Sequence, residues 1–581
     1  MDWMREPGAG RAARAADGGQ VPELTVVIPT YNRAGRLRAC LDALAAQTLV
    51  SEADEGAFEV IVVVDGSTDG TRELLARYSA PFPLKALWQE NSGQATARNR
   101  GIGEAAGRFC LLIDDDILAR PGLVAEHLRA QRETGGVLAA GRLTLRIPAD
   151  AGWYVRRYAA GWAAHYARLD TGAKPVTAEA CYGGNLSFPR AAFLAVGGFA
   201  VDLARGHDID LARRLVAHGL APRYLPLAEG VQDERKTWRE LLRDLEKAGE
   251  TVVPLYRRDP STLPVSGLAD FRRAGWASLA LRRLLLGLGV PVAALGALGP
   301  VLDRAARGRF YEFLRQYAFW RGVRRAASRE EWEGLTGAVT ILLYHAFAAP
   351  GGRPSRFVVP ARAFAWQMRW LARAGYRVLS LEEYARARRE HRLPPSRSVV
   401  VTLDDGYADN RAVAAPVLAS HRFPATIFLV TDRVGDANRW TAEGALAARP
   451  MLSWEEIRAL EGAGLRFAPH GRSHRGMEGL SSGELADEIG GAWTALEREL
   501  AHPVPVLAFP FGLHDAAVRT AAESLGLAGA CTAKPGRNTL LTPLYALRRT
   551  EIEGGTGRLR FRLAVWFGDT RPVRNRRRLR S

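Results

Sequence analysis

The sequence predicts an α/β protein with two separate catalytic units. Short apolar runs alternate with segments of helical periodicity from Leu24 onward, and the same alternation starts again at Val339. Acidic residues or histidines follow several of these runs, where the strands of a parallel sheet would end. Between the two series lies a nineteen-residue stretch without charge, Leu284–Leu302, in a chain whose net charge is +18.

The chain has 581 residues, which is too long for one core, because domains average roughly 150 residues. We predict five segments: a disordered N-terminus (1–22), a first catalytic domain (23–260), an apolar and basic helical connector (261–335), a second catalytic domain (336–560) and a basic tail (561–581). The N-terminus has no apolar run after its charges, so we expect no secretory signal. The four cysteines lack a CxxC spacing, which is typical of buried thiols in a reducing compartment.

The first unit is predicted from four strand-like runs and the helices between them. The runs are Leu24–Pro29, Phe58–Asp65, Leu84–Trp88 and Arg108–Asp114. Leucines at helical spacing follow the first run, and Gln94–Ala106 is also a predicted helix. This β-α-β-α order implies a parallel sheet covered by helices, with its ligand site beyond the carboxyl ends of the strands.

Polar residues stand at three of those strand ends. Thr30 and Tyr31 follow the first run, Asp65 ends the second, and the triplet Asp114–Asp116 ends the fourth. Three adjacent carboxylates repel one another and are costly to bury without a cation. A hard divalent ion such as Mg²⁺ or Mn²⁺, shared with a diphosphate, removes that cost. A solvated acidic turn is the alternative interpretation of the triplet.

The segments VVIPTYNR, VVVDGSTDGT, ENSGQATARNRGI and LLIDDD follow one another within about Leu24–Ala248. Together they resemble the family 2 glycosyltransferases. The resemblance implies a GT-A fold with a doubly wound mixed sheet, a nucleotide-sugar donor and an inverting transfer. By this resemblance the metal lies on Asp116. The implied donor-binding residues are Thr30, Tyr31, Asp65, Arg98, Asn99, Asp114 and Asp116.

A later segment, GHDIDLARRLVAHG (Gly206–Gly219), resembles an acidic helix start of the same family, with His207 in place of the usual Glu. An inverting transfer needs a carboxylate that deprotonates the acceptor hydroxyl. Asp208 matches the family's base, and Asp210 is its nearest rival. The alternative for Asp208 is an acid that only favours the helix dipole. The QxxRW motif of processive members is not evident, so we expect the addition of a single sugar.

The uncharged stretch Leu284–Leu302 would reach roughly 28 Å as a straight helix, just enough for a bilayer core. Glycines and prolines interrupt it, and arginines flank it on both sides. A single span normally shows a one-sided bias of basic residues. We therefore expect a re-entrant or interfacial hairpin, followed by an interfacial helix at Arg309–Arg325. A soluble helical pair and a single span are the alternatives.

The basic charge favours an anionic membrane surface as a partner. The tail Arg571–Arg580 carries six arginines, each worth about 1 kcal/mol near anionic lipid. No recognition module accompanies this charge, so we expect no nucleic-acid partner. We predict a cytoplasmic protein that is attached peripherally or monotopically to the inner face of the cell membrane.

The second unit is predicted from further alternating runs, which suggest a closed or partly open (β/α) barrel with its site at the carboxyl ends of the strands. Asp404 and Asp405 end one such run, and His470 ends another. His474 follows four residues later, a spacing that lets two imidazoles converge on one metal. Two histidines and one carboxylate leave a position open for water, as in a catalytic Zn²⁺ site. A surface histidine pair is the alternative.

The motifs TLDDG, HGRSH and AFPFG lie within about Ala338–Glu553 and resemble those of NodB-type polysaccharide deacetylases, carbohydrate esterase family 4. The resemblance implies a distorted (β/α) barrel that removes N-acetyl groups with Zn²⁺ or a similar divalent metal. It makes Asp404 the general base. The metal ligands would be Asp405, His470 and His474, and the backbone N–H of Phe511 would hold the oxyanion.

One element of that family has no match. The segment Tyr545–Thr550 lacks the late histidine that protonates the leaving amine. His514 and His345 are the candidates to replace it. Arg549 is expected to pair with Asp404.

The two resemblances predict a bifunctional enzyme of cell-envelope, exopolysaccharide or glycolipid biosynthesis. One half transfers a sugar, which we expect to be an N-acetylhexosamine, to a saccharide or lipid-linked glycan acceptor. The other half removes an N-acetyl group from the glycan product. Two alternatives stay open: a catalytically silent deacetylase-like module that only binds glycan, and a basic membrane scaffold in which both sites are vestigial.

Overall fold

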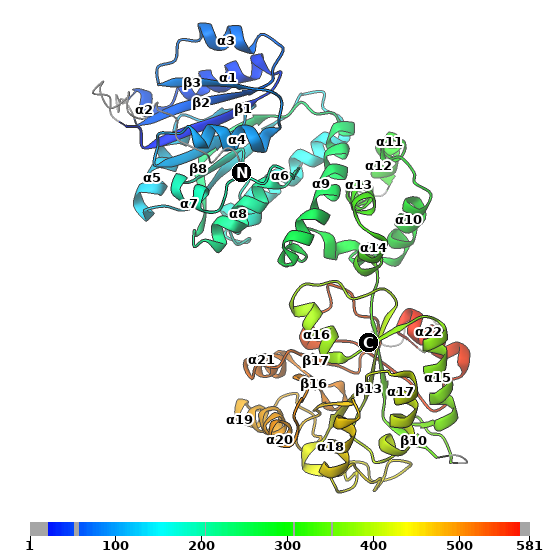
Figure 1. Ribbon diagram of the computed structural model, residues 1–581. Coiled ribbons are helices and arrows are strands. Elements are labelled where there is room, and N and C mark those ends of the chain that lie inside the picture. Colours follow the sequence, from blue (N-terminus) through cyan, green and yellow to red (C-terminus); the bar gives the residue numbers. More distant parts are fainter. Residues whose placement is uncertain (1–20, 52–56, 204, 306–307, 350–351, 570–581) are drawn as a thin grey trace. The chain divides into compact units, whose positions relative to one another are not determined.

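The computed structural model describes residues 21–51, 57–203, 205–305, 308–349 and 352–569 (Figure 1). The predicted disordered N-terminus up to residue 20, and the basic tail from residue 570, lie outside these ranges. The chain divides into two compact units. Unit 1 holds the residues up to Arg257 together with Ala280–Ala326, and unit 2 holds Arg258–Leu279 together with the residues from Ala327 onward. The predicted connector (261–335) thus contributes to both units, and the domain boundaries stay a prediction.

Within the described residues, unit 1 is built on an eight-stranded mixed sheet of order β3-β2-β1-β4-β7-β6-β8-β5. The strands β1 to β4 pair in parallel, whereas β7 runs antiparallel to both β4 and β6. The strands are β1 (Leu24–Thr30), β2 (Phe58–Asp65), β3 (Leu84–Gln89), β4 (Phe109–Ile113), β5 (Ile117–Ala119), β6 (Leu138–Arg146), β7 (Asn185–Pro189) and β8 (Pro222–Asp233). The four strands predicted from the sequence form the parallel half of this sheet.

Helices cover both faces of the sheet. Along β1, Leu24 and Val26 point into the core shared with α1 (Ala34–Ala45). Val27 points the opposite way, into the core shared with α4 (Gln94–Gly103). Strands buried on both faces read as continuous apolar runs, which is why the sequence signal was strong. The doubly wound α/β class predicted from the sequence is confirmed.

Most of the remaining helices of this region lie around the sheet (Figure 1). They are α2 (Thr48–Ser51), α3 (Thr71–Arg77), α5 (Leu123–Thr134), α6 (Trp153–Asp170), α7 (Arg190–Ala195), α8 (His207–Ala217) and α9 (Trp238–Arg258). The extent of α9 differs from the sequence analysis, which predicted no element over residues 249–258.

The helix α9 packs closely on α13 (Arg309–Ala326) through two glycines. A Cβ atom added at Gly249 would collide with the carbonyl oxygen of Phe319, and one added at Gly322 would collide with that of Glu246. Any larger residue at either position would force the two backbones apart. The glycines therefore fix the position of α9 against the rest of unit 1.

The uncharged stretch Leu284–Leu302 does not form one helix. It belongs to three short helices, α10 (Trp276–Gly287), α11 (Val292–Ala297) and α12 (Gly299–Ala305). The helix is interrupted after α10, where Gly289 adopts a φ of 67° and Pro291 is the N-cap residue of α11. Among the described residues, no helix combines the length and the apolar character that a membrane crossing requires.

The segment predicted as an interfacial helix is α13, and two of its six aromatic rings are fully buried. Tyr317 and Trp320 are fully buried, and the Tyr317 hydroxyl donates a hydrogen bond of 2.6 Å to the Val290 carbonyl oxygen. These rings are therefore not available to lipid. Six exposed leucine and valine side chains lie on and between the short helices: Leu281, Leu284, Leu288, Leu298, Val301 and Leu302. We call these six residues the leucine patch.

Unit 2 is built on a parallel six-stranded sheet of order β15-β14-β13-β9-β18, with β12 also paired to β13, within the described residues. A separate parallel pair, β16 with β17, and a short pair, β10 with β11, complete the strands. An incomplete ring of parallel strands with helices outside is the distorted (β/α) barrel that the sequence predicted. The strands are β9 (Thr340–Tyr344), β10 (Ala346–Ala348), β11 (Val358–Pro360), β12 (Arg377–Leu379), β13 (Ser398–Leu403), β14 (Thr426–Leu429), β15 (Arg466–Pro469), β16 (Val506–Ala508), β17 (Gly529–Cys531) and β18 (Arg549–Glu551).

The helices of unit 2 alternate with its strands, and two π-helical turns adjoin them. They are α14 (Arg329–Thr336), α15 (Ala361–Arg373), α16 (Leu381–Arg389), α17 (Ala415–His421), α18 (Trp454–Gly462), α19 (Ser482–Leu485), α20 (Ala492–Glu499), α21 (Ala516–Ser524) and α22 (Arg558–Phe567). A π-helical turn at Ala486–Gly491 joins α19 to α20. A second π-helical turn, Asn410–Ala414, precedes α17. Such turns are frequent at functional sites, and both of these support residues of the site described next.

Candidate active sites

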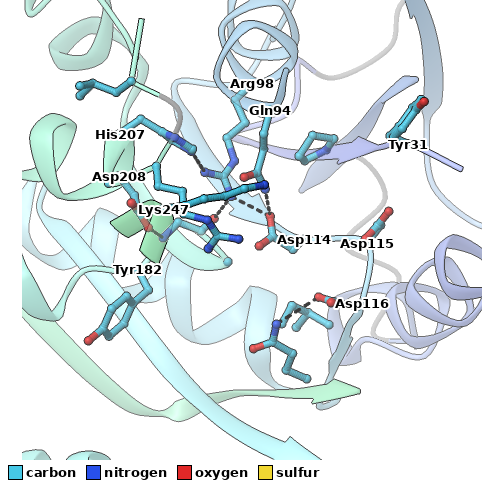
Figure 2. A pocket seen from close by; sticks show the side chains of 18 of the residues that line it. Tyr31, Gln94, Arg98, Asp114, Asp115, Asp116, Tyr182, His207, Asp208 and Lys247 are labelled. Carbon is cyan, nitrogen blue, oxygen red and sulfur yellow. Dashed lines mark hydrogen bonds and ion pairs between the residues drawn. The ribbon is translucent and has the colours of Figure 1, made fainter. Parts of the chain in front are cut away.

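A cavity of about 840 Å³ opens in unit 1 at the carboxyl ends of β1, β2 and β4 (Figure 2). The predicted residues that line it are Thr30, Tyr31, Asp65, Arg98, Asp114, Asp116 and Asp208. Asn99 lies behind the cavity instead. Its fully buried side chain donates to the carbonyl oxygen of Phe199 and accepts from the N–H of the same residue. The structure thus brings together every predicted residue of this site except Asn99.

Two carboxylates of the acidic triplet are already paired with cations. Asp114 accepts a bond of 2.7 Å from the guanidinium of Arg98, which is buried. Asp115 accepts from the Thr30 hydroxyl at 2.8 Å and from Arg33 at 3.0 Å. These contacts fix the turn after β4 and leave the third carboxylate to face the cavity with weaker partners.

That third carboxylate is Asp116, whose contacts are longer: 3.4 Å to Arg36, 3.5 Å to Gln232 and 3.7 Å to Arg33. Burial, together with the charges of Asp114 and Asp115, raises the pKa of Asp116 to about 6. A divalent cation beside Asp116 would relieve both effects. The donor set of carboxylate oxygens fits Mg²⁺ or Mn²⁺.

Asp65 shapes the other side of the cavity. Its carboxylate accepts hydrogen bonds from the backbone N–H groups of Ser92 and Gly93, at 2.8 and 2.9 Å, and from the Gln89 side chain at 2.7 Å. These bonds hold the loop that leads into α4. Tyr31 stands at the mouth and is half exposed.

Asp208 lies at the start of α8 and faces the cavity. One of its oxygens is 3.3 Å from the N–H of Gly183, and the residue stays partly exposed. The rival Asp210 is buried, is bound to Arg214 at 2.6 Å and does not line the cavity. Of these two carboxylates, Asp208 is therefore the one that faces the cavity.

His207 also lines this cavity. In the sequence it stood out only because the family usually has Glu at this position. Its Nε2 atom lies 3.2 Å from Arg98. A guanidinium can only donate, so Nε2 must accept the hydrogen bond. The imidazole is therefore neutral, with its proton on Nδ1. Burial lowers the pKa of His207, and the charge of Arg98 lowers it further. His207 thus ties α8 to the Arg98–Asp114 pair.

A second cavity, of about 600 Å³, lies in unit 2 and contains all five residues predicted there: Asp404, Asp405, His470, His474 and Phe511. One ligand atom from each of Asp405, His470 and His474 lies within 4.8 Å of the other two. The carboxylate of Asp405 is 3.5 Å from Nε2 of His470 and 3.3 Å from Nε2 of His474. Two imidazoles and one carboxylate at these distances fit Zn²⁺ or a similar ion.

The metal ligands are oriented from behind. Nδ1 of His470 lies 2.8 Å from the carbonyl oxygen of Ala508, which directs Nε2 toward Asp405. Glu488, in the π-helical turn, accepts from the N–H groups of Arg472 and Ser473 at 3.0 and 3.1 Å. The loop that joins the two histidines is therefore fixed by a buried carboxylate, which sequence spacing could not indicate.

Asp404 is held by Arg549 across 145 residues of chain. The two guanidinium nitrogens lie 2.5 and 2.8 Å from the two carboxylate oxygens, and both side chains are buried. Burial opposes ionisation of Asp404, but Arg549 outweighs it and lowers the pKa of this carboxyl. The pairing expected from the sequence is present and keeps Asp404 ionised at neutral pH.

Of the two histidines considered as proton donors, only His345 lines the cavity. Its backbone carbonyl accepts a 3.0 Å bond from Asn410, in the other π-helical turn. His514 is turned away: its Nδ1 lies 3.1 Å from the Gly512 carbonyl oxygen, and its ring stacks on Phe509. The geometry favours His345.

Trp440 also belongs to this cavity and was missed from the sequence. Its ring stacks on that of His474 with centroids 4.2 Å apart. Trp440 lies in a long loop without a motif, so only its place in the folded chain identifies it.

Comparisons with known proteins agree with this division. Residues 25–197 match the family model of glycosyl transferase family 2, and residues 391–530 match that of polysaccharide deacetylase. Validoxylamine A glucosyltransferase of Streptomyces hygroscopicus subsp. jinggangensis (strain 5008) is 30% identical over 294 residues, which cover 45% of this chain and 67% of that relative.

Two further proteins are similar to part of the chain. YxkH of Bacillus subtilis (strain 168), provisionally assigned as a polysaccharide deacetylase, is 26% identical over 215 residues, which cover 37% of this chain and 71% of that protein. The mannosyltransferase PcManGT of Pyrobaculum calidifontis, solved with GDP-Man and Mn²⁺, aligns with 54% of this chain and 92% of its own, at 20% identity and a TM-score of 0.35.

Proposed function

Because the chain belongs to the family 2 glycosyltransferases and carries a polysaccharide deacetylase domain C-terminal to that part, we propose that one protein both builds and trims a glycan of the cell envelope, an exopolysaccharide or a glycolipid. Unit 1 transfers a sugar, an N-acetylhexosamine in our proposal, to a saccharide or lipid-linked glycan acceptor. Unit 2 removes an N-acetyl group from the product. The observation that carries the proposal is that each cavity holds its own set of carboxylates: Asp114, Asp116 and Asp208 in unit 1, and Asp404 and Asp405 in unit 2.

In unit 1, the proposed transfer inverts the configuration at the anomeric carbon. Asp208 takes the proton of the acceptor hydroxyl as the new bond forms. Asp65 and Tyr31 border the nucleoside side of the cavity, and Asp114 faces the ribose. When bound at Asp116, Mg²⁺ or Mn²⁺ neutralises charge on the leaving diphosphate.

In unit 2, Asp404 takes a proton from the water that attacks the acetamide carbonyl, and the backbone N–H of Phe511 supports the oxyanion. Arg549 keeps Asp404 in place and ionised. When bound by Asp405, His470 and His474, Zn²⁺ or a similar ion polarises the carbonyl. His345 gives a proton to the leaving amine.

Replacing His345 with Gln is expected to lower acetate release by about a hundredfold or more, because loss of a general acid typically costs that much. His514→Gln is the matched control and should keep most of the activity, since His514 does not line the cavity. The measurement is acetate release at several pH values, together with bound metal. Equal losses in the two variants would remove His345 from the mechanism.

The catalytically silent alternative rests on one observation, the absence of a histidine in Tyr545–Thr550. In that version unit 2 only holds a glycan for unit 1. Bound zinc together with acetate turnover would exclude it.

The proposal as a whole is tested by mass spectrometry of products. The purified chain is offered a panel of nucleotide sugars with saccharide and lipid-linked acceptors. A product heavier by one sugar, followed by a mass loss of one acetyl group, supports both activities. Transfer without acetyl loss restricts the function to unit 1.

We further propose that the protein is cytoplasmic and attached to the anionic inner face of the cell membrane, peripherally or monotopically, through the leucine patch. The patch residues are 38–74% exposed, although an exposed leucine is costly in water. Exposed arginines, among them Arg304 and Arg309, lie close to the patch in sequence. Apolar side chains with basic neighbours match an anionic bilayer surface.

Replacing both Leu284 and Leu288 with Glu is expected to weaken binding to phosphatidylglycerol-containing vesicles by at least about tenfold. Two side chains that would insert into the bilayer are lost, and two carboxylates that anionic lipid repels take their place. Leu227→Glu is the matched control, since Leu227 is as exposed as Leu288, 69% in each case, but lies on β8. Co-sedimentation with anionic and neutral vesicles measures the effect. Unchanged sedimentation of the double variant would contradict a role for the patch.

A further inference from the structure

One wall of the cavity in unit 1 comes from a helix outside the segment that matches the glycosyltransferase model. The helix α9 contributes Lys247, Glu250, Thr251 and Pro254 to the lining. Figure 2 shows Lys247 at the same opening as Asp114 and Asp208. The wall is rigid, because Gly249, two residues beyond Lys247, lies in the close contact with α13.

Apart from Lys247, the arginines and the lysine that line this cavity already form ion pairs with carboxylates of the protein. Arg98 is bound to Asp114, and Arg33 is bound to Asp115. Lys236 and Arg205 share a third carboxylate, Asp244, at 3.1 and 2.5 Å. Each of these four cations therefore meets a carboxylate of the protein before any ligand binds.

Lys247 differs from all of them. Its ammonium group has no hydrogen-bond or ion-pair partner among the residues that the structure describes. Glu250, one turn further along α9, is bound to Arg325 of α13 and does not compensate it. An unpaired cation that faces a cavity lined with carboxylates is suited to an anionic ligand.

The chemistry of transfer supplies such a ligand. A nucleoside diphosphate carries about three negative charges, so one divalent ion beside Asp116 leaves charge uncompensated, and more develops as the bond to the sugar breaks. Arg98 cannot bind the diphosphate without breaking its ion pair with Asp114. A lysine is a compact point charge that commonly binds phosphate.

We propose that Lys247 binds the diphosphate of the donor and neutralises the leaving group, an inference that rests on the glycosyltransferase function proposed above. In the step itself, the acceptor oxygen bonds to the anomeric carbon while the bond from that carbon to the phosphate oxygen breaks. The electron pair stays on the phosphate oxygen, and the acceptor proton moves to Asp208. Lys247 exchanges no proton and acts by charge alone.

The test compares nucleoside diphosphates with the matching monophosphates, in calorimetric titrations with Mn²⁺ on the full-length protein. The probes are the uridine, guanosine and thymidine nucleotides. Lys247→Met is expected to weaken binding of the diphosphate by about tenfold and to leave the monophosphate unchanged, since one charge-assisted contact is lost. Lys247→Arg should recover most of the difference. Arg243→Met, also on α9 but outside the cavity lining, is the matched control.

Failure of the role of Lys247 and failure of the proposed glycosyltransferase function give different results. If wild type binds a diphosphate and Lys247→Met binds it equally well, Lys247 does not contact the diphosphate, and the inference fails alone. If Lys247→Met only raises the KM for the acceptor, the lysine serves the acceptor and the inference also fails. If wild type binds none of the three diphosphates, the glycosyltransferase proposal fails together with it.

Discussion

Replacing Asp208 with Asn is expected to reduce sugar transfer by about a thousandfold, with little change in the affinity for the nucleotide. The reason is that Asn keeps the shape and the contact with Gly183 but cannot accept the acceptor proton. Initial rates of transfer, measured alongside nucleoside diphosphate binding, separate these two effects. Acetate release by unit 2 from an N-acetylated glycan should be unchanged.

Asp210→Asn is the control for this experiment. Asp210 is buried against Arg214, so its loss should lower thermal stability and reduce transfer far less than the loss of Asp208. The opposite order, with transfer abolished by Asp210→Asn at unchanged melting temperature, would move the catalytic base to Asp210.

Replacing Asp405 and His470 together with Ala is expected to abolish acetate release and to remove the bound metal. Two of the three ligands of the site disappear, and the single remaining imidazole cannot hold a divalent ion against a chelator. Elemental analysis of the purified protein and an acetate assay measure the two effects. Transfer by unit 1 should persist.

Asp404→Asn is the informative companion variant. Asp404 contacts Arg549 and is not one of the three converging ligands, so this variant should keep its metal and lose acetate release. A wild-type protein without metal or turnover would establish the silent module. Acetate release that survives in the double variant would show that the metal site is assigned to the wrong residues.

The sequence predicted those features that depend on local order along the chain. Strands buried on both faces appear as apolar runs, and the residues that follow them, such as Asp65 and Asp405, necessarily gather at one edge of a sheet. His470 and His474 are four residues apart, so their convergence follows from spacing. For the same reasons the fold class of both units could be derived before any coordinates were known.

The features that the sequence did not predict depend on contacts between distant segments. Lys247 carries no motif, and only the packing of Gly249 on α13 places it in the cavity. Trp440 lies in a loop whose path is set by the rest of unit 2. The burial of Tyr317 was missed because mixed aromatic and basic residues are typical both of a lipid interface and of a helix covered by another helix.

The interleaved order of the two units has a consequence for synthesis of the chain on the ribosome. The α9 wall of the first cavity is covered only when α13 has been made, and Arg258–Leu279 of the other unit emerges before that. Domains generally fold as they emerge, N-terminal first. Here unit 1 cannot complete its fold until the ribosome has synthesised Ala326. By then Arg258–Leu279, a segment of unit 2, has emerged and has not yet met the rest of its unit. A fragment cut after the family-model match, at residue 197, would lack α9 altogether, and one cut before α13 would leave the face of α9 without its cover. Attempts to express the two activities separately should therefore divide the chain after α13.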